Sequence, residues 1–94
     1  MIGEKVRKLR ESHNILLRQL AAKLEMDTAM LSKMERGDRV FRKEDIEALA
    51  AIFSQPRQDL LSLWLADKIV KTVASEEYPL EALEIALKTI KDER

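Results

Sequence analysis

Several residue types are missing or scarce in this chain, and each absence excludes a class of protein. There is no cysteine, so neither a disulfide framework nor a thiolate metal site can form. A single histidine cannot build a metal site by itself. Glycine, proline and aromatic residues are few, and no long segment alternates between polar and apolar residues, which indicates a chain of helices. We therefore expect an all-α fold with no metal and no cofactor.

Long apolar segments and catalytic groupings are also missing. The longest apolar run, residues 60–66, is short and is interrupted by Ser62, so it cannot span a bilayer. The first residues show neither an apolar signal core nor a cleavage site. These features fit a protein of the reducing cytoplasm with no membrane partner. No nucleophile is paired with a base, so an enzyme has no support.

The charges balance over the whole chain but not over its two parts. Seventeen basic and seventeen acidic residues give a net charge of zero, which argues mildly against nucleic-acid binding. Residues 1–53 carry eleven Lys and Arg against nine Asp and Glu, whereas residues 54–94 carry six against eight. Any basic surface is therefore a local patch in the first part.

Periodicity and capping residues predict six helices. We expect them at residues 2–12, 17–24, 28–36, 43–53, from Pro56 to about 75, and from Pro79 onward. Asp27 is a suitable N-cap for the third helix, and Gly37 is suited to the position past its end. The fourth helix has an inner stripe of Ile46, Leu49, Ala50 and Phe53.

Residues 15–37 have the pattern of two short helices joined by a very tight turn. The small Ala21 lies where the helices must approach closely, and the inward positions hold Leu20, Leu24, Met26, Leu31 and Met34. In a helix-turn-helix the second helix lies in the major groove of DNA. Two short helices with a tight turn also occur in proteins that bind no DNA, so spacing alone leaves both interpretations open.

The outward side of the expected third helix is suited to contacting bases. It carries Thr28, Ala29, Ser32 and Lys33, which are short or polar. The hydroxyls can donate to or accept from base edges, Ala29 can contact a thymine methyl, and Lys33 can reach guanine or a phosphate. These four residues are the predicted base contacts.

The chain resembles the phage-repressor and Cro-like (XRE) family of helix-turn-helix proteins. The segments IGEKVRKLRE, LAAKLEMDTAMLSKMERG and IEALAAIF carry the resemblance, in that order, over about residues 2–53. It implies a compact repressor-like DNA-binding domain at residues 1–53, followed by C-terminal helices at 54–94.

Two positions depart from the pattern of that family. A polar residue usually opens the second helix and contacts phosphate, but Leu17 stands there, so the phosphate contact is assigned to Arg18. The turn usually holds glycine, and here it holds Glu25, at a position that favours positive φ. Arg39, Arg42 and Lys43 are the other expected phosphate contacts.

Residues 54–94 are predicted to form a dimer interface. The fifth helix is apolar nearly all round in its first half, so more than one neighbour must cover it. The last helix repeats Leu80, Leu83, Leu87 and Ile90 at the spacing of a packed helix pair. The predicted interface residues are Leu61, Trp64, Leu65, Leu83, Leu87 and Ile90. Trp64 and Leu87 can instead pack inside one protomer.

Two functions follow as hypotheses. The first is a homodimeric, sequence-specific transcription regulator that binds an inverted repeat in double-stranded DNA. The family resemblance implies control of a restriction-modification, phage or toxin–antitoxin operon. The alternative is an antitoxin-like interaction protein whose C-terminal helices hold a toxin, an enzyme or another regulator, with DNA binding secondary.

Overall fold

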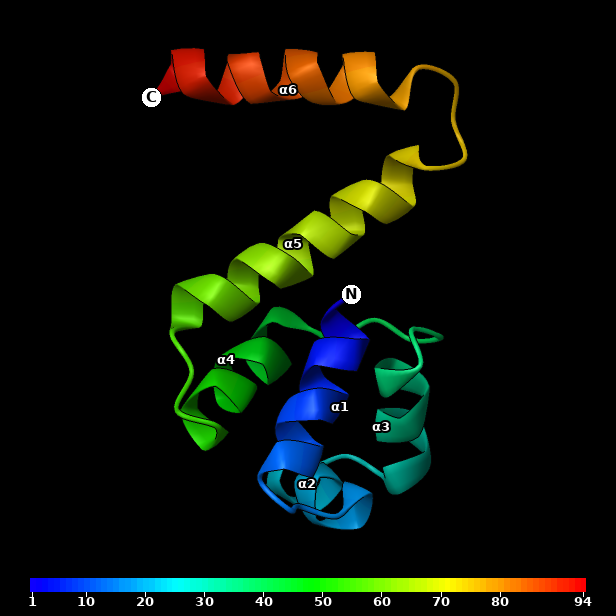
Figure 1. The fold of residues 1–94 in the computed structure, drawn as a ribbon, viewed down its shortest axis with the longest axis vertical. Coiled ribbons are helices and arrows are strands. Elements are labelled where there is room, and N and C mark those ends of the chain that lie inside the picture. Colours follow the sequence, from blue (N-terminus) through cyan, green and yellow to red (C-terminus); the bar gives the residue numbers. More distant parts are fainter.

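The computed structural model describes residues 1–94 as six helices without strands (Figure 1). The helices are α1 (Ile2–Ser12), α2 (Leu17–Lys23), α3 (Thr28–Glu35), α4 (Lys43–Ile52), α5 (Arg57–Val73) and α6 (Pro79–Glu93). The predicted all-α fold is confirmed, and the expected helix ends lie within two residues of the observed ones. Pro56 precedes α5 as its N-cap, whereas we expected it inside the helix.

One hydrophobic core joins α1 to α4 and the beginning of α5. The predicted inner residues of α4 are all buried, as are Ile2, Val6 and Leu9 of α1 and Leu31 and Met34 of α3. The core also takes in Leu60 of α5, of which 1% is exposed. The first turns of α5 are therefore part of the helical domain, because they cover a core that would otherwise face water.

Four of the six helices end in the same way, with one residue in the left-handed conformation. These residues are Asn14, Glu25, Gly37 and Ser54, with φ between 51° and 85°. After each of them the chain turns back, and two backbone N–H groups donate to carbonyls of the last helical turn. These endings allow the connections after α1, α2 and α4 to be only a few residues long.

A glycine permits the closest contact between α1 and α3. A Cβ atom on Gly3 would lie 2.5 Å from the carbonyl oxygen of Met34 and 2.6 Å from that of Glu35. Real Cβ atoms do not approach carbonyl oxygens so closely, so any side chain here would push the two helices apart. Gly3 thus fixes how deeply α3 is set into the domain.

The C-terminal half of the molecule extends away from this core. In Figure 1, α5 leads from α4 past α1, and α6 lies beyond α5, apart from α1 to α4. No residue of α6 is buried. No helix has both the length and the apolar character that crossing a membrane requires.

Candidate nucleic-acid interface

The turn between α2 and α3 has the geometry that the sequence predicted. Glu25 has a φ of 56°, and the N–H of Met26 donates to the carbonyl of Ala21 at 3.0 Å. Ala21 is 1% exposed, which confirms that a small side chain lies where the two helices meet. The turn sets α3 at a fixed angle to α2.

α3 is fixed at its start and along its inner side. Asp27 caps the helix, because its carboxylate accepts a hydrogen bond from the N–H of Met30 at 2.7 Å. Leu31 and Met34 anchor the inner side in the core. The predicted cap and the predicted inward residues of α3 are confirmed. Together they fix which side of α3 faces away from the core.

A buried ion pair holds the other end of α3. The guanidinium of Arg10 donates to Glu35 from Nε at 2.8 Å and from Nη2 at 3.1 Å, and from Nη1 to the carbonyl of Ile15. The hydrogen bonds that Arg10 donates to the carboxylate of Glu35 raise the pKa of Arg10 above its usual value. One side chain therefore connects α1, the loop before α2, and α3. The sequence patterns did not reveal this pair, because its members are 25 residues apart.

None of the four predicted base contacts belongs to the buried residues of α3, which are Leu31, Met34 and Glu35. Thr28, Ala29 and Lys33 are exposed. Ser32 is half-buried, and its hydroxyl accepts a long hydrogen bond, 3.4 Å, from Arg36. Their role as base contacts stays a prediction, but the structure leaves the three exposed side chains without competing partners.

The predicted phosphate contacts lie on two segments that flank α3. Leu17, at the start of α2, lines a hollow together with Ser32. On the other side, Arg39 and Arg42 of the loop after α3 line a second hollow together with Met30. Leu17, which precedes Arg18 in the chain, and this loop thus lie on either side of the outer face of α3.

The basic side chains of this region differ in whether a carboxylate of the same chain already pairs with them. Arg18, Lys33, Arg39 and Lys43 are exposed and form no ion pair. Arg42 is also exposed, but its guanidinium lies 3.2 Å from Asp45, and this hydrogen bond raises the pKa of Arg42. Asp45 also accepts the N–H of Arg42 at 3.0 Å and so caps α4. Arg42 therefore has a structural role besides any contact with DNA.

The start of α2 is capped without a polar first residue. The side chain of Gln19 reaches back and accepts the N–H of Leu16 at 2.8 Å. Leu16 itself is 47% exposed, and Leu17 is half-buried against the core. Gln19 thus satisfies one backbone donor, that of Leu16, directly before Leu17, which replaces the polar residue expected from the family resemblance.

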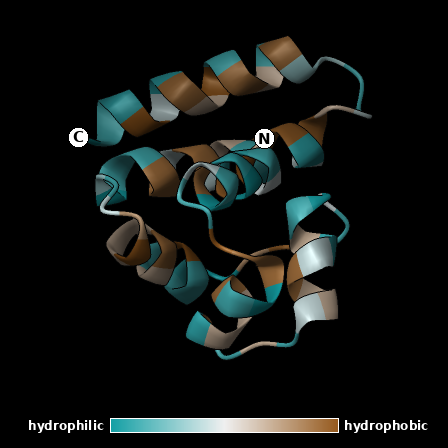
Figure 2. Ribbon diagram, turned by 60° about the horizontal axis from the view of Figure 1, so that its bottom comes forward, coloured by the Kyte–Doolittle hydropathy of each residue, from teal (hydrophilic) through white to brown (hydrophobic).

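The residues predicted for a dimer interface fall into two groups. Leu61 and Trp64 pack against the core of the same chain. Leu65, Leu87 and Ile90 are more than half exposed, and Leu83 is half-buried. Leu83 lines an open groove of about 330 Å³ between α5 and α6, together with Ile69, Val73, Ala82 and Ala86. Brown apolar bands recur on successive turns of α6 (Figure 2).

Comparison with known proteins identifies the family. A solved chain of the SinR protein/SinI protein complex has the same fold, with a TM-score of 0.57, 17% sequence identity and full coverage of both chains. No curated protein matches the sequence. Residues 2–63 match the family described as helix-turn-helix domain, a range that includes the first turns of α5. This family and this fold support a DNA-binding regulator. The chain therefore belongs to the helix-turn-helix domain family, as its resemblance to phage repressors predicted.

Proposed function

We propose that this protein is a sequence-specific transcription regulator that binds an inverted repeat in double-stranded DNA as a homodimer. The observation that carries the proposal is the exposed side of α3, whose short polar residues lie between two segments with unpaired cations. It acts by binding rather than by catalysis. Because its target is DNA, we expect it in the cytoplasm.

Base edges and phosphates are contacted by different residues in this proposal. Thr28, Ser32 and Lys33 approach base edges in the major groove, and Ala29 approaches a thymine methyl. Arg18, Arg39 and Lys43 contact phosphates and fix the position of α3 along the groove. Arg42 attracts phosphate less strongly, because the carboxylate of Asp45 beside it partly compensates its positive charge.

Two protomers are needed because one short helix contacts only a few base pairs. The apolar stripe of α6, formed by Leu80, Leu83, Leu87 and Ile90, is largely exposed in the single chain. The same patch on a second copy would cover it across a two-fold axis. The two recognition helices would then meet half-sites about one helical turn apart, roughly 34–36 Å.

Selection from random DNA tests this proposal. Duplexes that the full-length protein retains should share an inverted repeat, with half-sites centred roughly 10 base pairs apart. A chain in which Thr28 and Lys33 are both alanine should retain no common sequence. If the unaltered protein shifts no DNA at low salt, the proposal is wrong.

A second function is favoured by the exposed stripe of α6. The similar solved chain comes from a complex between two proteins, SinR and SinI. The C-terminal helices here would, by analogy, hold a partner protein such as a toxin or another regulator. A chain that purifies alone as a stable dimer supports the first function. A monomer that dimerises only with the product of a neighbouring gene supports the second.

A further inference from the structure

The loop between α3 and α4, residues 38–42, is attached to the rest of the protein at few points. Its ends are fixed, since the N–H of Asp38 donates to Lys33 and the N–H of Arg42 donates to Asp45. Between these ends, the ring of Phe41 is buried in the core, while Arg39 and Val40 are exposed. The loop carries or adjoins three of the four proposed phosphate contacts.

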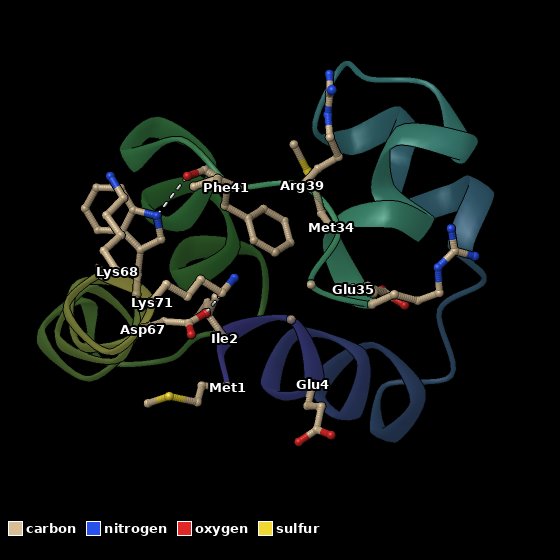
Figure 3. Close-up of a pocket in the computed structure, with 15 residues that line it drawn as sticks. Met1, Ile2, Glu4, Met34, Glu35, Arg39, Phe41, Asp67, Lys68 and Lys71 are labelled. Atoms are coloured by element: carbon tan, nitrogen blue, oxygen red, sulfur yellow. Dashed lines mark hydrogen bonds and ion pairs between the residues drawn. The ribbon is translucent and has the colours of Figure 1, made fainter. Parts of the chain in front are cut away.

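One hydrogen bond holds the middle of this loop, and it comes from α5. The indole Nε1 of Trp64 donates to the carbonyl of Phe41 at 2.8 Å, drawn as a dashed line in Figure 3. No other hydrogen bond involves the backbone of residues 39–41. The position of this carbonyl therefore depends on where α5 places the indole.

The indole is itself held in place. The ammonium of Lys68 lies 3.8 Å from the centre of the Trp64 ring, as a cation–π contact. One turn further along α5, Lys71 pairs with the buried Asp67 at 3.7 Å. Leu60 anchors the start of α5 in the core. Figure 3 shows Lys68, Lys71 and Asp67 on α5, facing Phe41 and the start of α1.

We propose that Trp64 is a positioning residue for DNA binding, which holds the loop of residues 38–42 so that Arg39 and Lys43 meet the phosphate backbone. This inference rests on the proposed DNA-binding function. Trp64 touches no DNA itself and acts through the carbonyl of Phe41. Because Trp64 lies on α5, this helix belongs to the DNA-binding unit as well as to the C-terminal helices.

The test removes the indole N–H and keeps an aromatic ring. In the full-length protein, Trp64→Phe should weaken binding to selected and to random DNA by the same factor, roughly two- to tenfold, the net value of one hydrogen bond. The slope of log affinity against log salt should become flatter by about one, because the phosphate contact of Arg39, which lies on the loop, is lost. The mass measured by light scattering should stay that of the unaltered protein.

A pair of double-mutant cycles separates positioning from general destabilisation. The effects of Trp64→Phe and Arg39→Ala should be less than additive, because both remove the same phosphate contact. The effects of Trp64→Phe and Lys33→Ala should add, because Lys33 lies on α3 and not on the loop. Additive effects in both cycles would overturn the inference.

A measurement without DNA separates failure of this inference from failure of the proposed function. Backbone order parameters of residues 39–42, from ¹⁵N relaxation, should fall in Trp64→Phe while those of α3 stay unchanged. Unchanged loop order, or a halved mass, would overturn the inference. If the unaltered protein binds no DNA but its loop loosens in Trp64→Phe, the proposed function fails and only the anchoring of the loop stands.

Discussion

Lys33 and Arg18 are both exposed and unpaired, yet they are expected to act on DNA in different ways. Lys33 lies on the outer side of α3 and is a base contact in our proposal. Arg18 lies in the first turn of α2 and is a phosphate contact in our proposal. A residue that contacts a base changes specificity, whereas one that contacts phosphate changes affinity for every sequence.

Substitution of these two residues should therefore give distinct results. Lys33→Ala should weaken binding to the selected site by about 1–3 kcal/mol and leave binding to random DNA nearly unchanged. Arg18→Ala should weaken both equally and flatten the salt dependence by about one unit. Fluorescence anisotropy at several salt concentrations measures both quantities. Equal losses on both DNAs for Lys33→Ala would make Lys33 a backbone contact.

The backbone at Glu25 carries strain that a single substitution can relieve. With a φ of 56°, Glu25 is in a conformation that costs a residue with a side chain roughly 1–2 kcal/mol. Glu25→Gly should raise the melting temperature slightly, because the more flexible unfolded chain offsets part of the gain. Thermal unfolding followed by circular dichroism tests this. A clear fall would show that the side chain of Glu25 stabilises the turn by more than the strain costs.

Among the helices, α6 is the one whose own chain covers it least. Leu87 is 55% exposed on the apolar stripe, and Ile85 is 68% exposed on the opposite side of the helix. Neither is needed for the core of the protomer. The pair therefore offers a variant and a matched control that differ only in the side of α6 that they occupy.

Leu87→Asp should convert the dimer into a monomer, because a charge in the centre of an apolar interface is not paired. Ile85→Asp should leave the dimer intact. Light scattering at micromolar concentration measures the mass, and circular dichroism should show both variants folded. Equal effects of the two substitutions, or an unaltered chain that is monomeric, would place the dimer contact elsewhere.

The positions of the helices could be predicted from local sequence, but the backbone conformation at the end of α4 could not. Asp27 and Gly37 are strong signals at the two ends of α3, and both act as predicted. Ser54 adopts positive φ after α4 without any signal in its residue type. Phe53 and Leu60, on either side of this turn, are both buried in the core, and contacts of that kind form only in the folded chain.

The contacts that hold the candidate site in place could not be predicted from the sequence, for a different reason. The Arg10–Glu35 pair and the hydrogen bond from Trp64 to Phe41 join residues more than twenty positions apart. Such contacts depend on the tertiary arrangement, and the periodicity of apolar residues along the sequence does not indicate them. The apolar character of α5 was visible in sequence, but the use of Trp64 within its own chain was only one of two alternatives.

At the scale of the whole molecule, the α5–α6 region links two DNA-contacting units in our proposal. A chain of 94 residues has a small core, so association adds stability as well as affinity. When one half-site is occupied, the second recognition helix is held near its own half-site at a high effective concentration. The dimer thus binds a full site far more tightly than either unit binds half of it.

The composition of the complex with DNA tests the central claim most directly. A duplex with one selected inverted repeat should bind two chains in a single cooperative step, as determined from the mass in analytical ultracentrifugation. Leu87→Asp should bind the same duplex weakly, and a duplex with one half-site destroyed should lose most of its affinity for the unaltered protein. One chain per duplex, or equal affinity for full and half sites, would contradict the account.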